Sequence, residues 1–173
     1  MSTDTTVTPA DLIIPGARMS LGYLMSLTKD VPVDRWADPG IDGMNHPAFL
    51  YGHLAIYPNR VLGKFLGRED LVKPCSFDED AVAQGAECKA DASLYPTMDE
   101  VLPFLQERYE TTIGAIAEAA PDVFGRENPA GGRFTEMLPT VGAAVNFMMG
   151  NHIMMHAGQM SHWRRGIGLG PAS

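Results

Sequence analysis

Apolar residues recur at intervals of three and four through most of this sequence, and few segments alternate with a period of two. Six positions near the C-terminus follow one helical face in steps of four, three, four, three and four: Val145, Met149, His152, His156, Gln159 and Trp163. A helix that carries such a stripe packs along it into a helical bundle. The pattern therefore predicts that the two histidines of this helix face the interior of the protein rather than the solvent.

Three further blocks begin with residues that are typical of helix N-termini. These residues are Thr8 with Asp11, Thr97 with Glu100, and Asn45 or His46 before Pro47. The first two pairs have the spacing of a capping box, and proline is tolerated in the first helical turn. Pro15 and Gly16 either kink the first helix or delay its start. Four long helical blocks predict an all-α four-helix bundle that forms a single domain over residues 1–173.

The connection from Gly67 to Thr97 is long for a compact domain, in which structureless loops of this length are uncommon. Within it, Ser76 and Glu79 repeat the spacing of a capping box. We therefore expect a short extra helix that begins at Ser76, in the connection after the second long helix.

The composition restricts the classes of partner. Apolar residues make up 45% of the chain, and 13 basic residues oppose 21 acidic ones, so the net charge is −8. Binding to nucleic acid or to an anionic membrane surface is therefore not expected. No apolar run is long enough to span a membrane, and the stretch MSTDTTVTPADL lacks the features of a signal peptide. We expect a cytoplasmic protein with Cys75 and Cys88 as free thiols and a small-molecule substrate as its partner.

His152 and His156 are four residues apart, so on a helix they differ by about 40° around the axis and about 6 Å along it. His53, in the second block, occupies a comparable inward position. Three imidazoles from two facing helices can hold a divalent ion, and zinc, nickel and iron(II) all accept such ligands. A histidine on a core stripe is also often a hydrogen-bonded structural residue, and the spacing alone leaves both interpretations open.

Residues one or two turns from these histidines are candidates for supporting roles. Gln159 follows His156 by one turn and either hydrogen-bonds the site or fills polar space in the stripe. Tyr57 and Arg60 follow His53 and are within reach of an anionic substrate, although an arginine here is also expected to extend to solvent. No catalytic residue is identified from the sequence.

The segments NHPAFLYGHLAIYPNRVLG and NHIMMHAGQMSHWRRGIGLGP resemble the DinB/YfiT-like superfamily of metal-binding four-helix bundles. Many of its members carry a Gly-His-Leu histidine on the second helix and a His-x-x-x-His-x-Gly-Gln helix near the C-terminus. The resemblance places the first of these histidines at His53 and the pair at His152 and His156. It covers both ends of the chain and the order of the long helices, whereas residues 67–135 match only in being helical and variable.

The resemblance implies a divalent metal ion (zinc, nickel or iron) held by three histidines, with further coordination positions open to water or substrate. Characterised relatives include transferases and isomerases that depend on bacillithiol, mycothiol or glutathione. We therefore expect a metal-dependent enzyme, a thiol-dependent S-transferase or isomerase that uses a low-molecular-weight thiol, and a homodimer, which is frequent in this family. The alternative is a non-catalytic stress-response bundle that binds a metal or small molecule, because no carboxylate accompanies the histidines as a general base.

Overall fold

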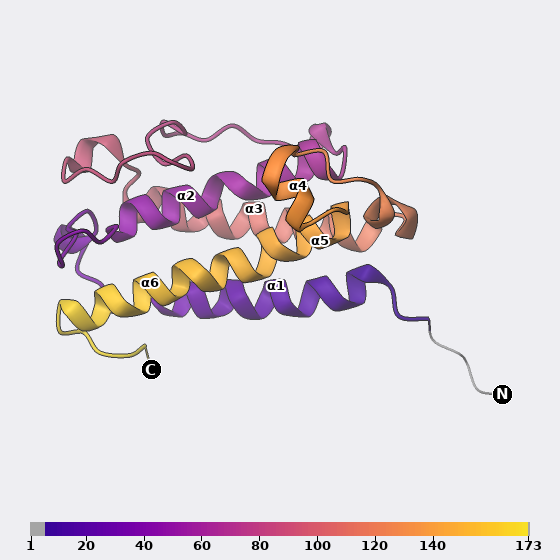
Figure 1. Ribbon diagram of the computed structural model, residues 1–173. Coiled ribbons are helices and arrows are strands. Elements are labelled where there is room, and N and C mark those ends of the chain that lie inside the picture. The colour runs from indigo at the N-terminus through magenta and orange to yellow at the C-terminus, as the bar shows by residue number, and fades with distance from the viewer. Residues whose placement is uncertain (1–5, 173) are drawn as a thin grey trace.

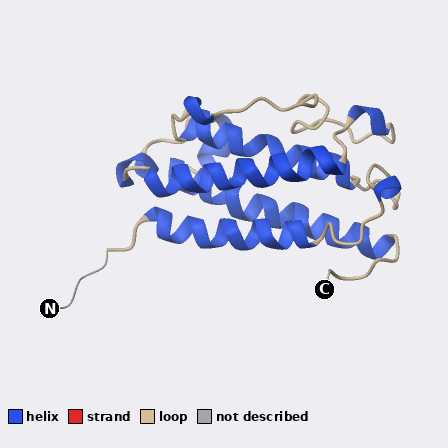
Figure 2. Ribbon diagram, turned by 180° about the vertical axis from the view of Figure 1, so that it is seen from behind, coloured by secondary structure: helices blue, strands red, loops and turns tan. Residues whose placement is uncertain are grey.

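Four long helices lie side by side in the computed structural model, which describes residues 6–172 (Figure 1). They are α1 (Pro9–Ser26), α2 (Pro47–Arg60), α3 (Met98–Glu118) and a fourth helix formed by α5 (Val141–Asn146), a π-helical segment (Phe147–Asn151) and α6 (His152–Gly166). Within the described residues there is no strand, only one isolated bridge between Glu127 and Thr140 (Figure 2). The predicted all-α bundle is therefore confirmed. Residues 1–5, which belong to the N-terminal stretch considered above, and residue 173 lie outside the described residues.

The connection between α2 and α3 returns along the bundle, so α3 runs in the same direction as α2 (Figure 1). α1 lies beside the fourth helix, and α2 packs against α3. A second π-helical segment, Val61–Phe65, continues α2. Shorter helical segments occupy the connections: Val33–Arg35, Glu69–Leu71, Ala92–Leu94, Pro121–Gly125 and α4 (Gly132–Met137). In the part of the chain that the structure describes, no helix is long and apolar enough to cross a membrane.

The helix starts confirm the capping signals. The Thr8 hydroxyl accepts a hydrogen bond from Asp11 N at 3.3 Å, and the Asp11 carboxylate accepts one from Thr8 N at 2.8 Å. Thr97 and Glu100 form the same reciprocal pair at the start of α3. At α2 the N-cap is His46, whose Nδ1 accepts a backbone N–H of the first turn at 3.1 Å. Side chains thus satisfy backbone groups that a helix start leaves without partners.

Prolines and glycines set the ends of the helices. α1 begins before Pro15 and continues through it, so its start is not delayed. After α2 and its π-helical extension the chain turns at Gly67, which has a φ of +69°. This left-handed conformation favours glycine and is typical of a helix C-terminus. α3 ends at Glu118, and Pro121 follows it.

The connection does contain short helical segments, but the prediction that one begins at Ser76 is wrong. The chain from 76 to 91 forms turns and bends, and the helical segments of this connection are the 3-10 turns Glu69–Leu71 and Ala92–Leu94. The Asp78 carboxylate accepts a hydrogen bond from Asp80 N at 3.0 Å, a local bond that competes with helical hydrogen bonding. Gly85 then adopts a φ of +88°, which an α-helix does not tolerate.

α2 is the most deeply enclosed helix, because every residue from Pro47 to Ile56 is buried. The long connection helps to cover it. A Cβ at Gly52 would meet Val82 Cγ1 at 2.9 Å and Pro96 at 3.4 Å, so only glycine allows the connection to approach this closely. Val82 is itself fully buried. The connection is therefore packed onto α2 at the level of His53.

The end of the fourth helix is tied to the rest of the bundle by Arg164. This side chain is only 2% exposed and has no carboxylate partner among residues 6–172. Its Nη1 donates to Leu27 O at 2.8 Å and to Lys29 O at 2.6 Å, and its Nε donates to Gly170 O at 3.3 Å. One guanidinium thus joins the end of α1, the end of α6 and the C-terminal tail.

Replacing Arg164 with Met is expected to lower the free energy of unfolding by roughly 2–4 kcal/mol, because one buried and two partly buried carbonyls lose a charged donor. Urea denaturation followed by circular dichroism measures the change. The matched control is Arg165→Met, which removes an exposed arginine whose side chain donates to Ser161 Oγ at 3.1 Å. Equal losses in the two variants would contradict the role of Arg164.

Candidate metal centre

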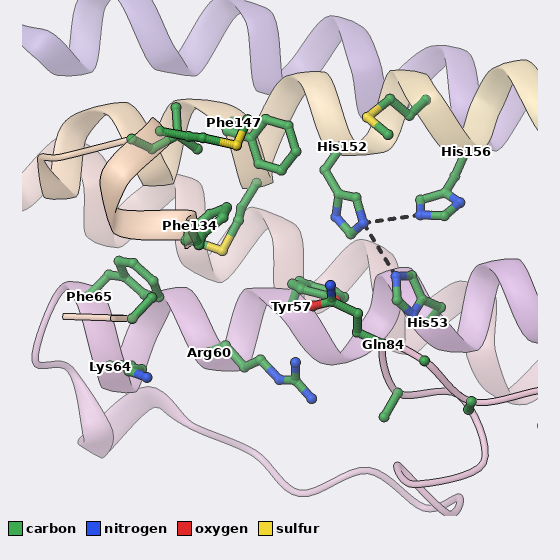
Figure 3. A pocket seen from close by; sticks show the side chains of 18 of the residues that line it. His53, Tyr57, Arg60, Lys64, Phe65, Gln84, Phe134, Phe147, His152 and His156 are labelled. Carbon is green, nitrogen blue, oxygen red and sulfur yellow. Dashed lines mark hydrogen bonds between the residues drawn. The ribbon is translucent and has the colours of Figure 1, made fainter. Parts of the chain in front are cut away.

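Three imidazoles meet at one point between α2 and α6 (Figure 3). His53 Nε2 lies 3.3 Å from His152 Nε2, and His156 Nε2 lies 3.0 Å from the same nitrogen. The candidate ligand atoms all lie within 4.8 Å of one another. His53 and His152 are buried, and His156 is partly buried. The structure thus brings together the three predicted residues in an arrangement that is compatible with a metal site.

Hydrogen bonds on the far side of two rings determine which nitrogen carries the proton. His53 Nδ1 donates to the carbonyl oxygen of Val82 at 2.7 Å. His156 Nδ1 donates to Gln159 Oε1 at 2.8 Å. A neutral imidazole has one N–H, so the Nε2 atoms of His53 and His156 both present lone pairs to the centre.

With the third ring included, this centre has more nitrogen lone pairs than N–H donors. His152 Nε2 can donate one hydrogen bond at most, and it faces two lone pairs. His152 Nδ1 is buried and has no hydrogen-bond partner among the described residues. A cation that accepts three lone pairs removes the mismatch at Nε2. Nitrogens bound at about 2.0–2.1 Å to a tetrahedral ion lie roughly 3.3 Å apart, and to an octahedral ion roughly 3.0 Å, which is the range of the two distances from His152 Nε2.

A π-helical turn positions the histidine pair on the fourth helix. The backbone N–H of His152 donates to Phe147 O, five residues earlier, instead of to the residue four positions back. Buried residues recur every four positions through this region, at Val145, Met149, Ile153 and Ala157. On an uninterrupted α-helix, each step of four residues rotates the side-chain direction about 40° beyond a full turn. The wider π-helical turn offsets part of that rotation. π-helical turns of this kind are frequent at functional sites.

Two of the residues expected around the site, Gln159 and Tyr57, lie beside the histidines. Gln159 is exposed rather than buried in the stripe, and it reaches His156 from the rim. The Tyr57 ring lies 4.5 Å from the His152 ring and 4.9 Å from the His53 ring. The stripe predicted from the sequence is therefore correct for the histidines, whereas Gln159 occupies its solvent edge.

Burial keeps the three imidazoles neutral. It lowers the pKa of His53 from the ordinary value of 6.5 to about 4 and that of His152 to about 3, and the neighbouring rings act in the same direction. Burial also lowers the pKa of His156. Neutral imidazole is the form that binds metals, so the three rings are in the ligating state at pH 7 without help from a carboxylate.

A pocket of about 750 Å³ opens onto the three histidines. This volume is within the range of small-molecule sites. One side is formed by α2 and its extension, and another by the fourth helix. Residues 83–86 of the long connection and the region of α4 complete the lining. A small molecule that enters this pocket therefore reaches the point where the three imidazoles converge.

Some residues of the site left no recognisable signal in the sequence. Val82 contributes a backbone carbonyl, and any residue type has one. Phe147 lies nearly parallel to the His152 ring, with centroids 5.9 Å apart, and Phe134 meets Phe147 edge-on at 5.8 Å. α4, which carries Phe134, lies outside the four long helical blocks recognised in the sequence. A helix of six residues is too short to show a clear period.

The chain's own thiols lie away from this centre. Cys75 and Cys88 are free, as predicted, and neither lines the pocket. Burial raises the pKa of Cys75 to about 12, and the hydrogen bond and charge of Glu79 act in the same direction. Burial also raises the pKa of Cys88. Both side chains are therefore protonated thiols at pH 7 and poor nucleophiles.

Fold and site together define a four-helix-bundle protein with three converging histidines in the lining of a pocket. Comparison with protein families gives the same class: the sequence profile of the DinB superfamily matches residues 18–160. The chain belongs to the DinB superfamily. Searches of curated proteins and of solved structures find no match to the chain.

In the metal-free protein, the free energy of unfolding is expected to fall as the pH drops from 6.5 toward about 5, where the carboxylates begin to titrate. The unfolded imidazoles bind protons near pH 6.5, whereas folded His53 and His152 bind them near pH 4 and 3. Stability is therefore complete above pH 6.5 and declines below it, by up to about 1.4 kcal/mol per pH unit for each buried histidine. Urea denaturation at a series of pH values measures this slope.

The pKa of His46, the α2 cap, is also lowered by burial, so wild-type protein carries a contribution from that residue too. His152→Gln is therefore expected to reduce the slope without abolishing it. His162→Gln, which changes an exposed histidine on the same helix, is the control. A slope unaffected by His152→Gln would show that this ring is not buried in its neutral form.

Proposed function

We propose that the protein is a metal-dependent enzyme whose divalent ion is held by His53, His152 and His156. The observation that carries the proposal is the convergence of three Nε2 atoms, two of them with lone pairs fixed by hydrogen bonds, at the inner end of a pocket. Three protein ligands leave coordination positions free, which is typical of catalytic rather than structural metal sites. Zinc, nickel and iron(II) are the candidate ions.

The reaction that we propose is the transfer or isomerisation of a small molecule with the help of a low-molecular-weight thiol. When bound, a divalent cation supplies Lewis acidity that lowers the pKa of a thiol toward neutrality. In an S-transfer the thiol gives its proton to water, its sulfur bonds to an electrophilic carbon, and the leaving group departs with the bonding electrons. Family membership supports this choice, because the resemblance noted above extends to thiol-dependent enzymes.

The chain's own residues have defined parts in this proposal. The Val82 carbonyl and the Gln159 side chain orient His53 and His156. Such partners of ligand histidines commonly change metal affinity by about 10- to 100-fold. Burial raises the pKa of Tyr57, so its hydroxyl stays protonated and is a candidate hydrogen-bond donor to the substrate. Aromatic rings on both sides of His152 limit the access of water.

The second candidate is a non-catalytic bundle that binds a metal or small molecule in a stress response. The observation that favours it is the absence of a carboxylate from the described lining of the pocket, so no Asp or Glu there can act as a general base beside the histidines. A thiol activated by a metal ion does not require such a base. We therefore retain catalysis as the first proposal.

Protein purified without an affinity tag is expected to contain about one divalent ion per chain by elemental analysis. His53→Ala and His156→Ala each remove a ligand and are expected to abolish stoichiometric metal, whereas Gln159→Leu weakens binding by about 10-fold. His162→Ala is the matched control on α6, because that histidine is exposed. The absence of metal from the wild-type protein after supply of zinc, nickel and iron(II) would refute the metal centre.

Turnover is expected when the metal-loaded protein is mixed with a low-molecular-weight thiol and an electrophile such as 1-chloro-2,4-dinitrobenzene. Bacillithiol, mycothiol and glutathione are tested in parallel, and product formation is followed by absorbance. His152→Ala should lower the rate to the uncatalysed level, whereas His162→Ala should leave it unchanged. Stoichiometric metal without thiol-dependent turnover across a panel of electrophiles would favour the non-catalytic alternative.

A further inference from the structure

The pocket has a charge that is opposite to that of the chain. The protein has 21 acidic residues and a net charge of −8. None of those acidic side chains is found in the described lining of the pocket, whereas Arg60 and Lys64 both belong to it. The field of the whole molecule therefore repels anions, and the pocket is a local exception. A concave site lined by one sign of charge raises the local concentration of ligands of the opposite sign.

Arg60 and Lys64 are separated from the three histidines along the helix. His53, Tyr57, Arg60 and Lys64 follow each other in steps of four, three and four along α2 and its π-helical extension, and all four line the pocket. At 1.5 Å per residue, Arg60 is about 10 Å along the helix from His53, and Lys64 lies a further turn away on the π-helical extension. Figure 3 shows the three imidazoles at one end of this row and Lys64 with Phe65 at the other.

Neither cation is engaged by a carboxylate in the described structure. The Arg60 guanidinium lies over the Tyr57 ring at 5.0 Å from its centroid, and both Arg60 and Lys64 are exposed. The ion pairs of the described residues involve other basic side chains. Arg68, one turn after Lys64, pairs with both Asp70 and Glu118. Arg60 and Lys64 are therefore available to a ligand, while their neighbour is not.

The space beside these cations has an apolar wall. Phe65, Phe134 and Phe147 line it, and Phe134 and Phe147 pack edge-to-face with centroids 5.8 Å apart. Met137 and Leu138 add further apolar surface. A very polar ligand would leave this wall without apolar contact, whereas an aromatic ring or alkyl chain would bury it.

We infer that the substrate is an elongated organic acid with an apolar body. Its acid group binds Arg60 and Lys64 at the rim, its body lies against Phe134 and Phe147, and its other end reaches the histidine centre. The inference deepens the proposed function and rests on it for the reaction at that other end. Recognition of the acid depends on Arg60 and Lys64 alone, so it is expected with or without metal.

A matched pair of ligands tests this assignment by isothermal titration calorimetry. 6-Phenylhexanoate carries the acid, and 6-phenylhexanamide has the same body without the charge. The acid is expected to bind at least about 10-fold more tightly than the amide, to metal-free and to zinc-loaded protein alike. Arg60→Gln and Lys64→Gln should each reduce that preference, and the double variant should abolish it while leaving the affinity for the amide unchanged.

Two controls separate this effect from other causes. Arg18→Gln removes an exposed cation on α1, outside the pocket, and should leave the preference intact. Phe134→Ala should weaken the acid and the amide to the same extent, because it removes apolar contact only. Raising the salt concentration should reduce the preference for the acid, since exposed charges are screened.

Equal affinities for the acid and the amide would overturn the inference, as would failure of the acid to bind. A preference that requires zinc and survives in the double variant would also overturn it, because the carboxylate would then lie on the metal. The metal-free measurement keeps this test independent of the proposed function. A protein that never retains metal can still show the preference, and a metal-loaded protein can lack it.

Discussion

The enclosure of α2 is the constraint on which the rest of the structure depends. Every residue from Pro47 to Ile56 is buried, so the polar groups on this stretch must find partners inside the protein. His46 meets this requirement as the N-cap of the helix, with its second ring nitrogen bound to Lys89 O at 3.0 Å. His53 meets it through Val82 on one side and the fourth helix on the other.

The long connection after α2 is best understood as part of this enclosure. It returns along the bundle, places Val82 against Gly52, and supplies the carbonyl that fixes the tautomer of His53. The same residues then continue into the rim of the pocket at Gln84 and Gly85. One irregular segment therefore both covers the core and shapes the site. Its structure is determined by tertiary packing rather than by helix formation.

Features governed by local spacing could be predicted from the sequence. The Thr8–Asp11 and Thr97–Glu100 pairs act within one helical turn, and the four-residue separation of His152 and His156 places both on one face. Non-local features could not be predicted. The helix expected at Ser76 had a capping signal, but contacts with Gly52 and turns around Asp78 determine the conformation there. The carbonyl partner of His53 is invisible in the sequence because every residue has that group.

The π-helical turn at Phe147–Asn151 has a consequence for the evolution of such a site. It can be regarded as an α-helix that has gained one residue, and one residue corresponds to about 100° of rotation. The helical faces before and after this turn are therefore set independently. The first half packs in the bundle through α5, and the second half directs its histidines to the pocket. A single insertion or deletion at this turn would redirect the histidine pair while the first half of the helix kept its contacts. Chains of similar architecture can thus gain or lose the three-histidine centre through a change in length, with every histidine still present in the sequence.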